Sequence, residues 1–435
     1  MRIIGNNPDA DNAEITAVAS GALANGSTVV VNTNGTVSVV SSTTVTESLG
    51  SAVVFENVYC RRIAATYDAN AQKVVIAYLD EGVSDYGRVV VGTVSGTSIS
   101  FGSPTTFESA RVDHISATYD ANAQKVVIAY EDGGNSNYGT AIVGTVSGTS
   151  ISFGSAVVFE SANSTETMSA TYDANAQKVV IAYQDGGNSY YGTAIVGTVS
   201  GTSISFGSAV VVQNTRTQHI STTYDSSAQK VVIAFYDDDN SDYGTAIVGT
   251  VSGTSISFGT PVVFNSADSE DVSVVYDSNA QKVVISYGDN GAGRGAAIVG
   301  TVSGTSISFG SPVFFSVQSA LYTVATYDAT AKKVVIAFSD LNNSYYGTVI
   351  SGTVSGTSIS FDSSTVFKAS SMNDFTLTYD ANAQKVVVAY KDGGNSNYGT
   401  SVVSRTGYVD TNLTSENFIG FSNAAYADTQ TATIE

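Results

Sequence analysis

One tandem repeat constrains the fold of this chain more than any other feature. The segment SATYDANAQKVVIAY occupies residues 116–130 and returns unchanged at residues 169–183. Near-copies surround five further tyrosines, 51 to 53 residues apart. The seven repeat tyrosines are Tyr67, Tyr119, Tyr172, Tyr224, Tyr276, Tyr327 and Tyr379. A period of this length is typical of solenoids and propellers, in which each unit buries its core only against its neighbours.

Each repeat is expected to form four β-strands. In the second repeat we predict strand A over residues 114–120, strand B over 125–130, strand C over 138–148 and strand D over 149–161, with a kink at Gly154. Apolar and polar residues alternate within these runs, and Gly, Asn and Asp gather between them. β-Branched residues, which fit a pleated sheet, are abundant. The sequence therefore predicts an all-β fold.

The two ends of the array favour a ring over an open stack. The seventh repeat lacks its strand D, and a matching segment, TESLGSAVVF, precedes the first repeat at residues 46–55. The orphan strand can complete the last unit if the array closes, and closure removes exposed sheet edges. We predict a seven-bladed β-propeller of four-stranded antiparallel blades over residues 46–408, closed by its N-terminal strand.

The flanks are expected to be small β elements. Residues 1–45 contain two alternating runs around Asn34-Gly35, a hairpin signal. Residues 409–435 are predicted to form a small β element or tail, and the sequence leaves open whether the chain is a fragment or a shortened form. Both flanks suit attachment or formation of a homo-oligomer.

Composition excludes several classes of partner. The formal net charge of −20 repels phosphate backbones, so nucleic acid is not expected to bind. Cys60 is the only cysteine, which excludes an intrachain disulfide. No apolar run is long enough to insert into a membrane, and no export signal is recognisable at the N-terminus. We expect synthesis in a cytoplasm, with release as part of an assembled particle.

Divergence among the repeats is confined to two connections. The C–D turn GTVSGTSISF occurs six times without a substitution, whereas the D–A crossings and the B–C loops differ from repeat to repeat. In an up-and-down blade these two variable connections emerge on the same face. We therefore expect binding on that face, because loops on a rigid scaffold carry most binding sites.

Two sets of side chains near this face are candidate ligand contacts. Tyrosines at the start of strand C offer an apolar face with a polar tip that suits sugar rings, although packing between blades is the alternative. Cations and imidazoles in the D–A crossings suit acidic glycans, or else local pairing with Asp113 and Glu108. The candidates are Arg61, Arg62, Tyr86, Arg111, His114, Tyr138, Tyr191, Arg216, His219, Tyr243, Tyr346 and Tyr398.

An aspartate follows strand B in every repeat. Carboxylates at this position suit Ca²⁺, the one cofactor considered, but recurrence in every repeat favours an Asx cap that holds the loop. The seven residues are Asp80, Asp132, Asp185, Asp237, Asp289, Asp340 and Asp392. A zinc site at His114 or His219 is disfavoured because no third ligand stands at metal spacing. Cys60 is expected to be a packed side chain.

The sequence of the repeat and of its flanks also resembles that of a known family. The segments VASGALANGSTVVVNTNGTVSVV, GTVSGTSISFGSAVVFES and NLTSENFIGFSNAAYAD resemble virion structural proteins of marine tailed phages, including those of cyanobacteria. The resemblance implies a tail-fibre or particle-surface protein that adheres to host envelope glycan or protein, and it offers no catalytic residues. We expect a non-enzymatic virion adhesin. The alternatives are a structural decoration protein docked on another virion subunit, and a glycan depolymerase.

Overall fold

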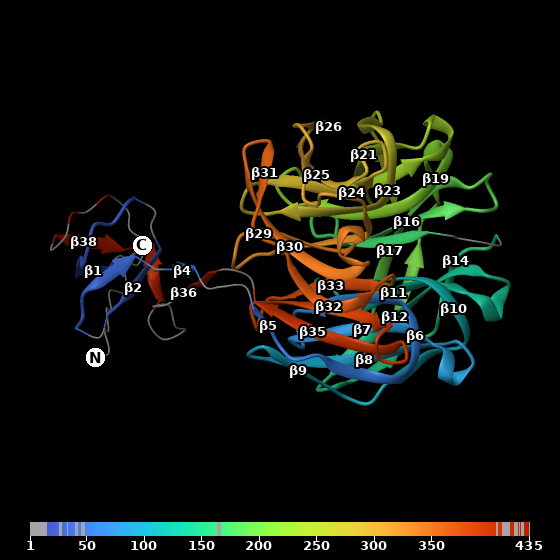
Figure 1. Ribbon diagram of the computed structural model, residues 1–435, viewed down its shortest axis with the longest axis horizontal. Helices are drawn as coiled ribbons and strands as arrows, with labels where there is room; N and C mark the ends of the chain where they lie inside the picture. Colours follow the sequence, from blue (N-terminus) through green and yellow to red (C-terminus); the bar gives the residue numbers. More distant parts are fainter. Residues whose placement is uncertain are drawn as a thin grey trace. The chain divides into compact units, whose positions relative to one another are not determined.

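The computed structural model describes residues 15–25, 28–32, 34–39, 42–44, 48–162, 167–405, 408–410, 418–421, 425, 427 and 430–434. The chain divides into two compact units. The smaller comprises Met1–Thr46 and Gly407–Glu435, and the larger comprises Glu47–Thr406. Figure 1 shows the larger unit as an array of short, repeated antiparallel sheets.

The smaller unit is built from both ends of the chain. Its antiparallel pairs are β1 (Ile15–Val18) with β38 (Thr431–Ile434), β2 (Thr28–Val31) with β3 (Val37–Val39) and β37 (Phe418–Phe421), and β4 (Ser42–Thr44) with β36 (Tyr408–Asp410). The hairpin around Asn34 and Gly35 is present as β2–β3. The sequence did not predict that the two flanks pair with each other. Residues 411–417, where part of the expected tail element falls, lie outside the described residues.

In the larger unit the first six repeats have the predicted order of strands A, B, C and D, and the seventh has strands A, B and C. The inner A strands are β6 (Val53–Asp68), β10 (Thr105–Asp120), β15 (Met168–Asp173), β19 (Val210–Asp225), β23 (Val262–Asp277), β28 (Ala320–Asp328) and β33 (Phe375–Asp380). The B strands are β7 (Lys73–Asp80), β11 (Lys125–Asp132), β16 (Lys178–Asp185), β20 (Lys230–Asp237), β24 (Lys282–Asp289), β29 (Lys333–Asp340) and β34 (Lys385–Asp392). Several A strands begin as strand D of the preceding repeat, so one long strand serves two neighbours.

The C and D strands complete each repeat. The C strands are β8 (Tyr86–Ser95), β12 (Tyr138–Ser147), β17 (Tyr191–Ser200), β21 (Tyr243–Ser252), β25 (Arg294–Ser303), β30 (Tyr346–Ser355) and β35 (Tyr398–Arg405). Strand D starts as β9 (Ser98–Phe101), β13 (Ser150–Phe153), β18 (Ser203–Phe206), β22 (Ser255–Phe258), β26 (Ser306–Phe309) and β31 (Ser358–Phe361). Its separate second halves are β14 (Val157–Glu160), β27 (Val313–Phe314) and β32 (Thr365–Ser371). Short 3₁₀ turns η1 (Glu81–Val83), η2 (Gly133–Asn135), η3 (Asp238–Asn240) and η4 (Leu341–Asn343) form B–C loops.

Strand D breaks at the predicted glycine because the next repeat lies against it. A Cβ atom on Gly154 would stand 1.8 Å from the carbonyl oxygen of Thr202, which belongs to the SGTS turn of the following repeat. The same clash recurs at the equivalent glycines of other repeats. In the sixth repeat the position is Asp362, whose carboxylate pairs with Lys333. The seventh repeat has no SGTS turn, so a side chain fits there. The uniform C–D turn is therefore a contact between repeats.

The apolar core lies between adjacent repeats. Clusters of buried Val, Ile, Ala, Tyr and Phe join each described repeat to the next, as Val75 and Val91 join Ile128 and Tyr130. One such cluster joins the first repeat to the seventh, through Val74 and Val387.

Strand pairing also connects the first and seventh repeats. β35 of the seventh repeat pairs antiparallel with β6, and with β5 (Ser48–Leu49), from the start of the unit. In the larger unit the ladders of the described strands form three separate sheets. Repeats in different sheets are joined by side-chain packing. These repeats are β-propeller-like. No helix among the described residues is long and apolar enough to cross a membrane.

Candidate functional site

The D–A crossings and B–C loops lie together, as the sequence predicts. In the second repeat Gly134 of the B–C loop is packed so closely on Ala110 of the D–A crossing that an added Cβ would stand 2.5 Å from the Ala110 side chain. In the fifth repeat Asn290 Nδ2 donates a hydrogen bond of 3.0 Å to the carboxylate of Asp268. The variable segments therefore share one face of the larger unit, which we call the variable face.

The aspartates after strand B act as caps of the B–C loops. Asp132 Oδ1 accepts a 2.9 Å hydrogen bond from the backbone N–H of Gly134. Five further repeats show an equivalent bond, and Asp237 lacks one. Burial raises the pKa of Asp132, and the loop N–H groups oppose that effect. Across the described ranges no three His, Cys, Asp or Glu side chains gather as a metal site would need. Calcium binding by these aspartates stays a prediction.

The repeat tyrosine and the aspartate beside it serve the scaffold. Asp120 Oδ1 accepts from the backbone N–H of Ala123 and holds the A–B turn. The hydroxyl of Tyr172 accepts from the backbone N–H of Asn122 in the preceding repeat, at 3.2 Å. The bond from Asn382 to Tyr67 makes the same link between the seventh and first repeats, at 3.1 Å. These contacts within and between repeats explain why the YDANAQ sequence hardly varies.

The tyrosines predicted as sugar contacts are the first residues of the C strands, and their side chains are half-buried. Each one is partly covered: Tyr86, Tyr138, Tyr191, Tyr243, Tyr346 and Tyr398. More exposed rings stand one residue earlier in two repeats, where Tyr190 is 37% and Tyr345 is 42% exposed. Both take a left-handed backbone conformation, which turns the ring outward and which the repeat pattern alone does not reveal.

Most of the predicted cations are engaged in local pairs. Arg61 Nε lies 2.8 Å from Glu81, and Arg216 Nε lies 3.1 Å from Asp238. Arg216 also stands over the Tyr190 ring at 5.4 Å. Glu108, proposed from sequence as an arginine partner, instead accepts from the Tyr130 hydroxyl at 3.1 Å. These contacts are partly exposed and contribute little to stability.

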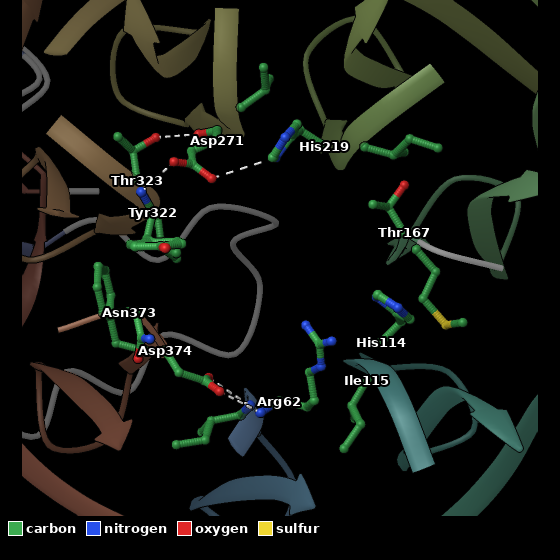
Figure 2. Close-up of a pocket in the computed structure, with 16 residues that line it drawn as sticks. Arg62, His114, Ile115, Thr167, His219, Asp271, Tyr322, Thr323, Asn373 and Asp374 are labelled. Atoms are coloured by element: carbon green, nitrogen blue, oxygen red, sulfur yellow. Dashed lines mark hydrogen bonds and ion pairs between the residues drawn. The ribbon is translucent and has the colours of Figure 1, made fainter. Parts of the chain in front are cut away.

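Arg62, His114 and His219 belong to a different arrangement. Each stands five residues before its repeat tyrosine, and the seven residues at this offset are all close to one cavity of about 450 Å³. We call them the ring residues; they are Arg62, His114, Thr167, His219, Asp271, Tyr322 and Asp374. The residue after each is mostly apolar and lines the same cavity, here called the central pocket. Figure 2 shows the labelled ring residues around this cavity.

A β-bulge at the start of strand A presents the ring residues to the pocket. Pairing of β10 with β11 skips from Asp113 to Ser116, which leaves His114 outside the ladder. The same skip occurs in four other repeats. At all five bulges the ring residue has a φ between 47° and 57°, a conformation that non-glycine residues seldom adopt. Such strain is concentrated at functional sites.

Acidic ring residues fasten neighbouring repeats together. Asp271 Oδ2 accepts from the backbone N–H of Tyr322 at 2.5 Å, and its backbone carbonyl accepts from the Thr323 hydroxyl. His219 Nδ1 lies 3.5 Å from Asp271 Oδ1. Burial raises the pKa of Asp271, and His219 opposes this effect. Asp374 accepts from the backbone N–H groups of Arg62 and Ile63. Sequence reasoning missed the acidic members, although their constant offset from the tyrosine was visible.

A hydrogen bond from a tyrosine to a glutamate recurs in the larger unit. Tyr78, Tyr130 and Tyr183 donate to glutamates Glu56, Glu108 and Glu160 in three successive repeats. Burial, followed by the charge of Asp132, raises the pKa of Glu108. A set that recurs at three junctions suits a structural role better than one catalytic centre.

The comparisons with known proteins concern the fold. No model of a known family matches the chain, and no curated protein matches it. Among solved structures, the BP39L lectin from Burkholderia pseudomallei aligns with a TM-score of 0.59 at 9% identity, over 81% of this chain and 97% of that one. The likeness is one of fold. A mutant Aleuria aurantia lectin in complex with Fucα1-6GlcNAc aligns with a TM-score of 0.47 at 13% identity, over 72% and 98% of the two chains. The SapL1 lectin in complex with α-methyl fucoside gives 0.41 at 11%, over 73% and 97%.

Proposed function

We propose that the seven repeats are seven blades of a propeller, closed by its N-terminal strand. Support comes from the junction of the seventh and first repeats, where β35 pairs with β6 and a buried cluster spans both repeats. A Cβ on Gly50, ahead of the first repeat, would stand 1.7 Å from the Thr97 carbonyl oxygen, the contact that Gly154 makes with Thr202. One kind of packing therefore serves internal junctions and the closing junction alike.

On this scaffold we infer a non-enzymatic glycan-binding function for the variable face. The observation that carries it is the set of ring residues. Five residue types occupy seven equivalent positions in a chain whose A–B and C–D turns are nearly identical, and they surround a pocket of about 450 Å³. Packing alone would favour the same residue in every repeat. A pocket of this size with several hydrogen-bonding groups suits a sugar. The lectin name of the BP39L protein agrees with this class of ligand.

The biological setting remains the proposal of a virion adhesin. It rests on the sequences of the repeat and the flanks, which resemble those of virion proteins of marine phages. The partner would then be a host envelope glycan or protein. Several copies on a particle would add their affinities by avidity. A structural decoration protein is the weaker alternative, because packing between repeats explains why the SGTS turn is uniform.

Binding of the labelled full chain to a broad glycan array and to marine bacterial cells tests this function. We expect retention by a subset of glycans that chelation with EDTA does not abolish. Loss of binding in EDTA would identify the loop aspartates as calcium ligands instead of caps. Release of reducing ends from a bound polysaccharide would show the depolymerase alternative. An absence of binding to every glycan and strain would contradict the proposal.

A further inference from the structure

Five of the seven ring residues lie in two unlike sectors, with His219 and Asp374 between them. Arg62, His114 and Thr167 come from three successive repeats and line one side of the pocket in Figure 2. Asp271 and Tyr322 lie on the side facing them. The first sector offers hydrogen-bond donors and a positive charge, whereas the second offers a carboxylate and a phenol. A pocket with this polarity binds one ligand in one orientation, unlike a site repeated in every blade.

Arg62 is held in place from outside the pocket. Its Nε donates a 2.7 Å hydrogen bond to Asp113 Oδ1, and Asp113 is almost fully buried. Arg111 contacts the other oxygen of the same carboxylate, with Nη2 at 2.7 Å. Burial disfavours the charge on Asp113, but the bonds from Arg111 and Arg62 outweigh it and lower its pKa. Two arginines share the Asp113 carboxylate, and the backbone of Arg62 also meets the Asp374 carboxylate.

The guanidinium end of Arg62 is directed into the pocket. The Arg62 side chain remains 41% exposed, and Figure 2 shows its guanidinium extending toward the centre of the cavity. Because Nε is engaged by Asp113, the two terminal nitrogens are oriented together. A planar guanidinium fixed in this way matches a planar carboxylate with two parallel hydrogen bonds. This is an uncommon feature in a chain with a net charge of −20.

The neighbours of Arg62 add neutral polar groups. Burial, followed by the charge of Arg62, lowers the pKa of His114 to about 4, so its imidazole is neutral at pH 7 and offers one donor and one acceptor. Thr167 Oγ1 is buried and has no hydrogen-bond partner in the part of the chain that the structure describes.

We propose that the central pocket binds the carboxylate of one acidic sugar residue, with Arg62 as its charge partner. This inference rests on the proposed glycan-binding function and names its ligand class, a uronic acid within a glycan. His114 contacts the second carboxylate oxygen or an adjacent hydroxyl. Asp271 and Tyr322 contact hydroxyls on the far side of the ring. The pocket accepts one such residue per chain.

Matched pairs of sugars test this assignment by calorimetric titration of the full chain. Oligogalacturonate, oligoglucuronate and oligomannuronate are each compared with the neutral oligosaccharide of the same ring stereochemistry. We expect one acidic member to bind with a stoichiometry of one and at least about tenfold more tightly than its neutral counterpart, the effect of one charge-assisted hydrogen bond. Arg62→Gln should abolish this preference, and Arg62→Lys should retain part of it. Lys125→Gln, at an A–B turn outside the pocket, should leave it unchanged.

The outcomes separate the assignment of a uronic acid to the central pocket from the general glycan-binding function. An acid preference that survives Arg62→Gln, or a stoichiometry of several sugars per chain, overturns the assignment to the pocket. Equal binding of acidic and neutral partners overturns the ligand class while the glycan-binding function stands. Tighter binding of sulfated than of uronic sugars overturns the carboxylate geometry. Failure to bind any carbohydrate defeats the proposed function itself. Thermal unfolding of each variant confirms that the fold is retained, since Asp113 keeps its bond to Arg111 in both Arg62 variants.

Discussion

The Asp374 carboxylate is bonded to the backbone of Arg62, 312 residues earlier in the chain. Its two oxygens accept from the N–H groups of Arg62, at 2.6 Å, and Ile63, at 3.1 Å. Asp374 precedes the inner strand of the seventh repeat, and Arg62 lies at the bulge of the first. One side chain therefore joins the proposed ring at its closing junction.

Removing this carboxylate should loosen the closing junction. We expect Asp374→Ala to lower the free energy of unfolding by about 2–3 kcal/mol, because two backbone donors lose a charged acceptor. Urea unfolding of the full chain, followed by circular dichroism, measures the change. Asn373→Ala, at the adjacent position, is the control and should have little effect. Equal stability of Asp374→Ala and the wild type would show that the junction does not depend on this contact.

His114 should make stability depend on pH. Its pKa is lowered to about 4 in the fold by burial and by Arg62, with Arg111 adding to this and Asp113 opposing it. The unfolded chain has an ordinary histidine pKa near 6.5, so between about pH 6.5 and pH 4 the unfolded state binds more protons. Stability from His114 is thus complete above pH 6.5 and declines as the pH falls.

The pH effect is measured as a difference between wild type and His114→Gln. Gln does not titrate, so the free energy of unfolding of the wild type should fall by about 2–3 kcal/mol more than that of the variant between pH 7 and pH 4. The raised pKa values of Asp271 and Asp374 act in the opposite direction in both proteins and cancel in the comparison. A difference that does not change with pH would contradict a neutral, buried His114.

The glycine at the break of strand D should tolerate no side chain. Gly154→Ala places a Cβ 1.8 Å from the Thr202 carbonyl oxygen, and we expect a loss of about 3 kcal/mol or more as the neighbouring repeat is displaced. Gly148→Ala is the matched control: its φ is +60° but nothing lies within 4 Å, so the cost should be about 1 kcal/mol. Thermal denaturation of both variants decides. Similar losses would mean that the repeats do not pack as described.

Cys60 should be unreactive in the native protein. Its side chain is fully buried, and burial together with the charge of Glu56 raises the pKa of the thiol. Since the thiolate is the reactive form, we expect no labelling by iodoacetamide at pH 8 in buffer and one equivalent in denaturant. Rapid labelling of the folded chain would place the thiol at an accessible site.

Repetition made much of the scaffold predictable. The strand order, the start of strand B at Lys125 and the break at Gly154 all follow from alternation and turn residues within one repeat. The reason for the uniform SGTS turn does not follow from the sequence, because its partner lies in the next repeat and no local pattern marks a contact 48 residues away.

The gathering of the ring residues around one pocket could not be predicted from the sequence. His114 and Arg62 were singled out as unusual residue types, whereas Asp271 and Tyr322 resembled ordinary loop residues. What unites them is a bulge with a left-handed backbone, which alternation does not encode. The pairing of the flanks, such as β1 with β38, was likewise beyond reach because each segment is a short strand without a local partner.

The central claim, that the ring residues of the variable face bind glycan, is tested most directly on one array with three proteins. The wild type is compared with a pocket variant, His114→Asn with Tyr322→Asn, in which Asn tolerates the left-handed backbone. The control variant, Asn122→Ala with Asn175→Ala, changes exposed side chains of the A–B turns on the opposite face. The account predicts that the pocket variant loses the glycans the wild type retains, while the control variant keeps them. Binding that persists in the pocket variant, or that disappears only in the control variant, would contradict it.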